Sequence, residues 1–169
     1  MFAQSESEIF FTTYHQPQLG DLFLLANQKQ ELIGLYFKNH KCKPEIQKHW
    51  KKASELPIFI KTQAFIHEYC LGIRKDFADL PIAFFRGTAF QLKVWSGLCS
   101  LKYGTTVSYL DLARKVGFPK AVRAVANSVG RNPMSIIVPC HRVIGANGAL
   151  TGYAGGLLVK KAILELEKK

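Results

Sequence analysis

A chain of 169 residues, 48% of them hydrophobic, is long enough to bury one or two cores of its own. Residues 1–14 carry acids rather than a basic region ahead of an apolar run, and no stretch holds the roughly 18 uncharged apolar residues of a membrane helix. We therefore expect a protein that is neither secreted nor membrane-spanning, located in the cytoplasm, or in the nucleus of a eukaryote. Four cysteines without a CxxC pair argue against a disulfide framework.

The net charge of +11 is unevenly distributed. Residues 1–85 hold ten Lys and Arg against nine Asp and Glu, whereas residues 86–169 hold thirteen against three. An excess of this kind suits a surface that faces a polyanion, because each neutralised phosphate releases counterions. Charge alone leaves nucleic acid, an anionic membrane and a merely solvated basic face as alternatives.

The first half predicts a small α/β domain, a small sheet plus helices, over residues 1–85. Its expected elements are a β-hairpin from residues 21–26 and 31–37 and helices over 45–52 and 61–74. The boundary is expected near Leu80-Pro81-Ile82, where the charge balance changes. His40, Cys42 and His49 match no common zinc spacing, so we expect no metal.

The second half predicts a mostly α, winged helix-turn-helix-like domain over residues 86–169. Its expected helices are 88–101, 109–116, 120–129 and 157–166. Thr88 with Gln91 forms a capping box for the first, and Ser108 with Asp111 caps the second. The second and third are separated by a tight turn that contains Gly117, which is typical of a helix-turn-helix.

The predicted helix over residues 120–129 has an unusually small surface. Ala121 and Ala124 would let this helix approach another backbone closely, while Arg123 would project from it. Val122, Val125 and Val129 are interpreted as core residues. A slim helix with one long cation suits insertion into a groove of DNA. Neighbouring basic residues that could hold phosphates are Arg114, Lys115, Lys120 and Arg131.

Cys140 is the candidate nucleophile. The apolar run 135–138 predicts a buried strand or extended segment that delivers it. His141 offers a base, Arg142 a positive field, and the glycine-rich residues 145–156 room for a planar ligand, which together favour thiolate over thiol. The alternative, an inert buried cysteine, is our interpretation of Cys42, Cys70 and Cys99.

The run Pro139-Cys140-His141-Arg142-Val143-Ile144, with Asn132-Pro133 ahead and Gly152-Tyr153-Ala154-Gly155-Gly156 behind, closely resembles the methylated-DNA–protein-cysteine methyltransferases, also called alkylguanine-DNA alkyltransferases. The similarity extends from about Gly87 to Glu167. The resemblance implies a repair protein that flips 6-O-alkylguanine out of duplex DNA and transfers the alkyl group irreversibly to itself. Single turnover, no cofactor and a monomer are expected.

The resemblance also implies a role for individual residues. Cys140 matches the alkyl acceptor, His141 the base that acts through a water, and Glu167 the carboxylate that orients it. Asn132 matches the asparagine that braces the active-site turn. Tyr109 matches the tyrosine that rotates the 3′ phosphate and bonds the guanine, and Arg123 the arginine that replaces the extruded base. The expected substrate pocket comprises Val143, Tyr153, Ala154 and Gly155, with amides near Val143 and Ala154 bonding the leaving guanine.

Three other functions are weighed against this one. Alkyltransferase-like proteins share the architecture and bind the lesion but lack the acceptor, which Cys140 argues against. A helix-turn-helix regulator would need polar side chains along its recognition helix, where this chain has mostly Ala and Val. A cysteine hydrolase that does not act on DNA would leave the uneven charge unexplained.

Overall fold

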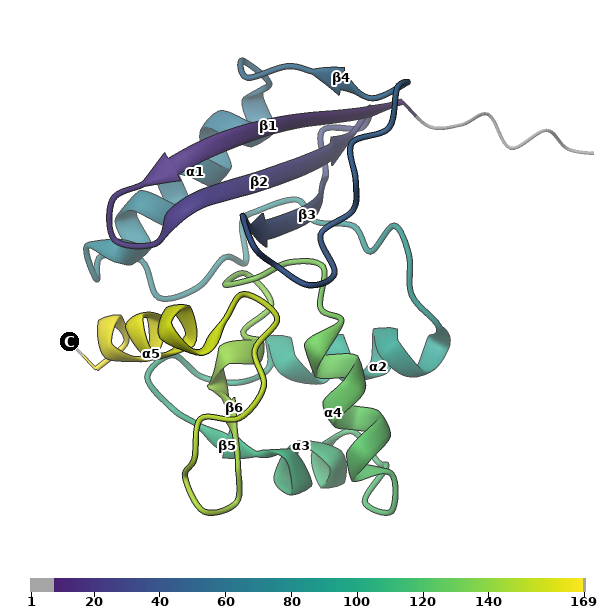
Figure 1. The fold of residues 1–169 in the computed structure, drawn as a ribbon, viewed down its shortest axis with the longest axis vertical. Helices are drawn as coiled ribbons and strands as arrows, with labels where there is room; N and C mark the ends of the chain where they lie inside the picture. Colours follow the sequence, from purple (N-terminus) through teal and green to yellow (C-terminus); the bar gives the residue numbers. More distant parts are fainter. Residues whose placement is uncertain (1–7, 169) are drawn as a thin grey trace, which may run out of the picture.

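The computed structural model describes residues 8–168, which form an upper layer of sheet and helix above a lower layer of helices (Figure 1). The upper elements are β1 Ile9–Gln16, β2 Gly20–Asn27, β3 Leu32–Phe37, β4 Lys51–Lys52 and α1 Pro57–Cys70. The lower ones are α2 Ala89–Cys99, β5 Val107–Ser108, α3 Tyr109–Lys115, α4 Val122–Gly130, a 3-10 turn Cys140–Arg142, β6 Val143–Ile144 and α5 Leu157–Leu166.

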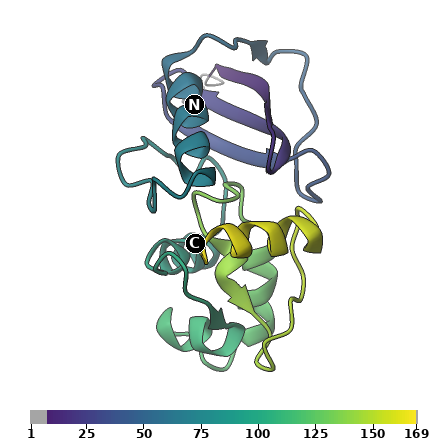
Figure 2. The same ribbon diagram turned by 90° about the vertical axis from the view of Figure 1, so that its left-hand side faces the viewer.

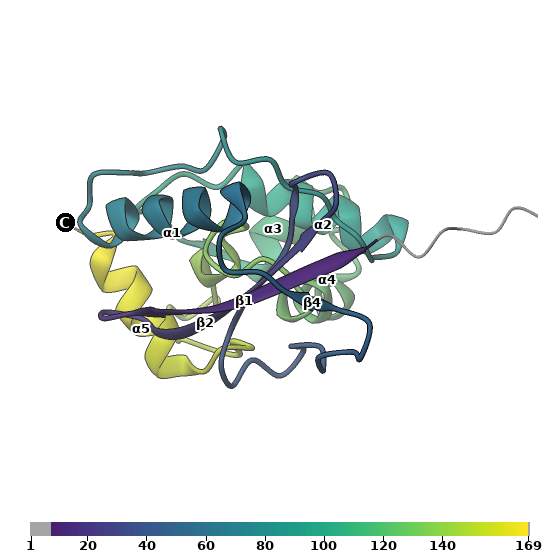
Figure 3. The same ribbon diagram turned by 90° about the horizontal axis from the view of Figure 1, so that it is seen from above.

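The upper sheet has the strand order β3-β2-β1-β4, with β1, β2 and β3 antiparallel and β4 parallel to β1. Helix α1 lies on one side of it, and residues 38–50 run along the other side (Figure 3). That second face carries its own small apolar cluster: Ile9, Phe23, Leu25, Ile33 and Tyr36. The sheet is therefore covered on both faces, whereas an antiparallel sheet can leave one face exposed to solvent.

One larger core joins the two layers, which Figure 2 shows from the side. Leu24 and Leu35 of the sheet belong to the same buried cluster as Val94, Leu98 and Leu112 of the helices. The backbone of Leu35 also exchanges hydrogen bonds with the segment that leads to Cys140: its N–H donates to the oxygen of Pro133, and its oxygen accepts from Ser135 N–H, both at 2.9 Å. Strand β3 thereby fixes the position of that segment.

Several predicted elements are confirmed. The hairpin corresponds to β2 and β3, and the last helix to α5. The capping box of α2 is present, with Gln91 N–H donating to Thr88 Oγ1 at 3.2 Å and Thr88 N–H to Gln91 Oε1 at 2.9 Å. Ser108 caps α3 through Asp111 N–H at 3.0 Å. These local signals hold because each is satisfied within one turn of chain.

The predicted helix over residues 45–52 is wrong. Residues 41–50 form turns and irregular chain, and 51–52 pair with β1 instead. This segment must cross the sheet face to reach the β1 edge, and Ile46 stays 52% exposed, so no packed helical face forms. Strand β1 itself was not predicted. Helix α1 starts at Pro57 rather than residue 61, because proline favours the first helical turn, and ends at Cys70 rather than 74.

Residues 135–138 are buried as predicted, but the predicted strand or extended segment is wrong. The chain makes a tight turn there, in which Ile137 N–H donates to Ser135 O and Val138 N–H to Met134 O, each at 2.9 Å. Ile136 adopts a left-handed conformation with φ 72°, which is strained for a β-branched residue. Within residues 8–168, no helix is both long and apolar enough to cross a membrane.

The substitution Gly97→Ala should lower the free energy of unfolding by about 1–3 kcal/mol. The added Cβ would lie 2.2 Å from Val116 Cγ1, where α2 passes the end of α3. The matched control is Gly130→Ala on α4, where nothing lies within 4 Å of the added Cβ. Urea denaturation of both variants checks the prediction, and a Gly97→Ala protein as stable as the wild type would contradict it.

Candidate active site

Cys140 is held by a single buried amide. Its Sγ accepts a hydrogen bond from Asn132 Nδ2 at 3.1 Å. The same nitrogen donates to Val138 O at 2.7 Å and Met134 O at 3.2 Å, while Asn132 Oδ1 accepts from Met134 N–H at 3.0 Å. The asparagine thus joins both ends of the tight turn to the sulfur, and replaces the ladder bonds that a strand would have made.

The sulfur of Cys140 rests as a thiol. Burial raises the pKa of this thiol above its ordinary value, and the Asn132 hydrogen bond and the nearby charge of Lys160 lower it only in part. The expectation of a favoured thiolate is therefore wrong for the structure as it stands. Because only the thiolate is a strong nucleophile, reaction at Cys140 needs a base that removes the proton.

Glu167 lies at the centre of a buried cluster that draws on both layers. Its carboxylate accepts from Tyr69 Oη of α1 at 2.6 Å, from His141 Nε2 at 2.9 Å and from Gly104 N–H at 3.1 Å. The guanidinium of Arg142 adds bonds of 2.7–3.1 Å. Burial would raise the pKa of Glu167, but the hydrogen bonds from His141, Arg142 and Tyr69 outweigh it and hold it below its usual range. The carboxylate is therefore ionised.

His141 is a neutral base with one free lone pair. Since Glu167 can only accept, Nε2 of His141 carries the proton that it donates. Burial lowers the pKa of His141, and Glu167 opposes that shift only partly. Its Nδ1 is buried and has no hydrogen-bond partner among residues 8–168. This tautomer leaves Nδ1 able to accept a proton, directly or through a water.

Lys160 is a functional candidate that the sequence analysis missed. Its buried Nζ donates to Val143 O at 2.6 Å and Thr151 O at 2.9 Å. Burial lowers the pKa of Lys160 to about 8, against the attraction of Cys140. The signal was present in the sequence, because Lys160 shares the buried face of α5 with Ile163.

The positive charge near Cys140 therefore comes from Lys160. The sequence analysis had instead expected it from Arg142. The guanidinium of Arg142 is engaged by Glu167 and by Leu101 O at 2.6 Å. Arg142 balances the charge of the Glu167 carboxylate, whereas Lys160 acts on the sulfur. The two cations are held apart by their separate hydrogen-bond partners.

A hollow of about 570 Å³ opens beside this site. Five of the predicted residues line it: Tyr109, Arg123, Arg131, Tyr153 and Ala154. It is also lined by residues 151–154 and by Lys41 and Cys42 from the first half. Tyr109 Oη donates to Thr151 O at 3.2 Å. The hollow is therefore built by α3, α4, the glycine-rich loop and the segment after β3.

The expected pocket residues have different surroundings. Tyr153 lines the hollow, and burial, followed by the nearby Cys140, raises the pKa of its hydroxyl well above the usual value. Ala154 is half-buried in the same hollow. Gly155 packs against β3, where an added Cβ would lie 2.7 Å from Phe37 Cδ2. The N–H of Val143 donates to Cys140 O, so it is not free to bond a leaving oxygen.

The surface of α4 agrees with a slim helix. Arg123 and Ala124 are exposed and Ala121 is half-buried, while Val125 and Val129 face the core. Two further predicted basic residues, Arg114 and Lys120, are exposed but do not line the hollow. Arg114 contacts Asp111 at 3.3 Å. Among residues 8–168, no three His, Cys, Asp or Glu side chains gather as a metal site would require.

Comparisons with known proteins agree on one family. Residues 89–169 match the family model described as 6-O-methylguanine DNA methyltransferase, DNA binding domain. A methylated-DNA–protein-cysteine methyltransferase of Haemophilus influenzae is 38% identical over 94% of this chain and 86% of its own length. One of Methanosarcina acetivorans is 41% identical over 94% and 98%. A crystal structure of Mycobacterium tuberculosis OGT in complex with DNA superposes with a TM-score of 0.85, at 40% identity, over 94% of this chain and 93% of that one.

Replacing Lys160 with Met should slow the alkylation of Cys140 by iodoacetamide at neutral pH. The substitution removes the charge that lowers the thiol pKa, so the rate should recover only at higher pH. The matched control is Lys161→Met, at the exposed neighbouring position. The rate is measured by peptide mass spectrometry over a pH series. Identical profiles for the Lys160 variant and the wild type would show that Lys160 serves packing alone.

Proposed function

The chain belongs to the methylated-DNA–protein-cysteine methyltransferase family, and on this premise we propose that it repairs DNA by transferring the alkyl group of 6-O-alkylguanine to its own Cys140. The observation that carries the proposal is the buried series Cys140, His141 and Glu167. A buried thiol is followed in the chain by a neutral base, whose Nδ1 has no partner among residues 8–168, and the carboxylate fixes the tautomer of that base. Such a series can activate a soft nucleophile without a metal.

The transfer is a displacement at carbon. The proton of the Cys140 thiol passes to Nδ1 of His141, directly or through a water, while the sulfur electron pair forms the new S–C bond. The bond between that carbon and the guanine 6-oxygen breaks, and its electron pair leaves with the base. We assign to Tyr109 the hydroxyl that bonds the departing guanine, in exchange for its hydrogen bond to Thr151 O. The product is a thioether whose neutral sulfur is a poor leaving group, so each molecule acts once.

We propose that residues 86–169 form the DNA-binding and alkyl-acceptor domain and residues 1–85 a small α/β domain. Helices α3 and α4 would act as a winged helix-turn-helix, with the slim surface at Ala121 and Ala124 entering the minor groove. Arg123 would fill the gap left by the extruded nucleotide, offsetting part of an opening cost of a few kcal/mol. Arg114, Lys120 and Arg131 would contact phosphates. The protein would act as a monomer in the compartment that holds the genome.

A lesion-binding module without transfer is the second candidate. Such a protein needs the hollow and the cationic α4 but not a nucleophile. The presence of Cys140, braced by Asn132 and adjoining a neutral histidine, favours transfer. The two candidates differ in whether the chain gains mass.

Excess duplex DNA carrying 6-O-methylguanine should methylate each chain once. Intact mass should rise by one methylene and then stop, because nothing regenerates the thioether, and the peptide that contains Cys140 should carry the change. Cys140→Ser should bind the duplex with nearly unchanged affinity yet gain no mass. Continued turnover, dependence on a metal, or methylation at Cys42, Cys70 or Cys99 would each refute this assignment.

Arg123→Ala should slow transfer from duplex DNA much more than transfer from the free alkylated base. Only the duplex has to be opened and held open, and Arg123 is exposed on α4 at the edge of the hollow. Single-turnover rates on both substrates check this, with Lys161→Ala as an exposed basic control that does not line the hollow. Equal slowing on both substrates would assign Arg123 a structural role.

A further inference from the structure

The nearly neutral first half contains a strongly basic segment. Residues 38–52 hold six lysines against one acid, Glu45, for a net charge of +5. The rest of residues 1–85 is therefore acidic, and the average conceals the segment. In the structure this segment leaves β3, passes beside the glycine-rich loop and crosses to β4 on the side of the sheet opposite α1 (Figures 1 and 3).

The start of the segment is fixed against the candidate active site. Lys41 N–H donates to Ala154 O at 3.0 Å, and Cys42 Sγ contacts Gly130 O of α4 at 3.7 Å. His40 is buried edge-on to the Tyr36 ring at 5.2 Å, and its Nδ1 accepts from Cys42 N–H at 3.1 Å. Burial lowers the pKa of His40 to about 4, so the imidazole stays a neutral acceptor. The Lys41 backbone is thereby preorganised.

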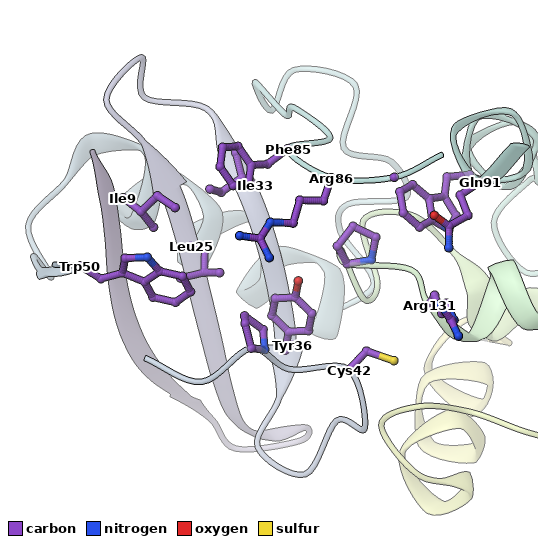
Figure 4. A pocket seen from close by; sticks show the side chains of 14 residues that line it. Ile9, Leu25, Ile33, Tyr36, Cys42, Trp50, Phe85, Arg86, Gln91 and Arg131 are labelled. Atoms are coloured by element: carbon purple, nitrogen blue, oxygen red, sulfur yellow. The ribbon is translucent and has the colours of Figure 1, made fainter. Parts of the chain in front are cut away.

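Two hollows meet along this segment. The hollow beside the active site shares Cys42 and Arg131 with a second one of about 250 Å³, between the sheet face and α2. Figure 4 shows the second hollow, in which Arg86 extends from the chain between α1 and α2 toward Tyr36. The residues that line the two hollows therefore include Arg123 and Lys41 at one end, Arg131 in both, and Arg86 at the other. The series from Arg123 to Arg86 is called the path below.

The cations along this path are not neutralised by the protein. Lys38 pairs with Asp21 and Lys51 with Glu8, both away from the hollows. Lys41, Arg86 and Arg131 form no ion pair within residues 8–168; Arg131 donates to Asn127 Oδ1 at 3.2 Å. All three are exposed. Uncompensated charge on an ordered backbone binds phosphate at a lower entropic cost than charge on a mobile segment, and it releases counterions.

We propose that Lys41 and Arg86 form a second DNA-backbone surface beside Arg131, which holds the phosphates that flank the extruded nucleotide. The first half of the chain is then part of the DNA interface and does not only support the core. The inference rests on the proposed function in that duplex DNA is the partner. The basic segment 38–52 extends the same surface beyond Lys41.

The test compares two double variants that each remove two positive charges. Lys41→Ala/Arg86→Ala changes the proposed surface. Lys29→Ala/Lys75→Ala is the control: Lys29 lies in the turn beside Gln30, which contacts the start of α1, and Lys75 lies over the Tyr103 ring at 5.8 Å. Affinity for a 6-O-methylguanine duplex is measured by fluorescence anisotropy against salt. Unfolding midpoints confirm that both variants fold, and Lys41→Arg/Arg86→Lys should retain the wild-type behaviour.

Removing two phosphate contacts should reduce the slope of log affinity against log salt concentration by about 2. The ratio of wild-type to variant affinity should therefore shrink about tenfold between about 50 and 200 mM salt. The control should keep the wild-type slope. The inference would be overturned if Lys41→Ala/Arg86→Ala kept the wild-type slope. It would also be overturned if the slope of the control variant fell by the same amount.

Methylation of Cys140 at saturating DNA separates this result from the proposed function. If only the proposed second DNA surface is wrong, both double variants keep the wild-type salt slope. The wild type and both variants then still gain one methyl group. If the proposed function is wrong, the wild type gains none.

Discussion

The buried carboxylate of Glu167 is the constraint on which the rest of the site depends. It is the residue that follows α5, and it gathers donors from α1, from the loop before β5 and from the turn after Cys140. Removing one partner of a buried charged cluster costs about 3–5 kcal/mol, because the remaining charge is left uncompensated. The cluster therefore couples folding of the whole chain to the protonation state of His141. Tyr69 gives the first half a direct part in that coupling.

The separation of the two buried cations follows from this arrangement. Arg142 is next to Cys140 in sequence, yet its planar guanidinium matches a carboxylate and turns to Glu167. Lys160, twenty positions away, reaches the carbonyls of Val143 and Thr151 and contributes the charge that acts on the sulfur. A thiol that burial protects from ionising is also protected from adventitious oxidation, and reacts when a base and an electrophile are both in place.

The sequence predicted elements whose signals are local. The capping residues Thr88 and Ser108 identified α2 and α3 because each cap is closed within one turn. Residues 45–52 were mispredicted because their path is set by the distant β1 edge, and residues 135–138 because the side chain of Asn132 supplies the hydrogen bonds of the turn. The β1 edge lies outside a short window of sequence, and nothing in the apolar run 135–138 shows that the nearby Asn132 side chain replaces its ladder bonds.

The site was predicted unevenly for the same reason. His141 was predicted as a base from its place next to Cys140, whereas the role of Glu167 came only from the resemblance. Tyr69 and Lys160 were not predicted as site residues, because only packing brings them to Glu167 and to the oxygens of Val143 and Thr151. Averaging charge over half the chain concealed the basic segment at residues 38–52.

The central claim is that His141, held neutral by Glu167, takes the proton of Cys140 during transfer. The single-turnover rate of methyl transfer, measured against pH for the wild type and His141→Gln, tests it most directly. The account predicts a lower rate for the variant, with its rising limb moved to higher pH, because the thiol must then ionise without its proton acceptor. A variant with the same rate as the wild type at every pH would contradict it.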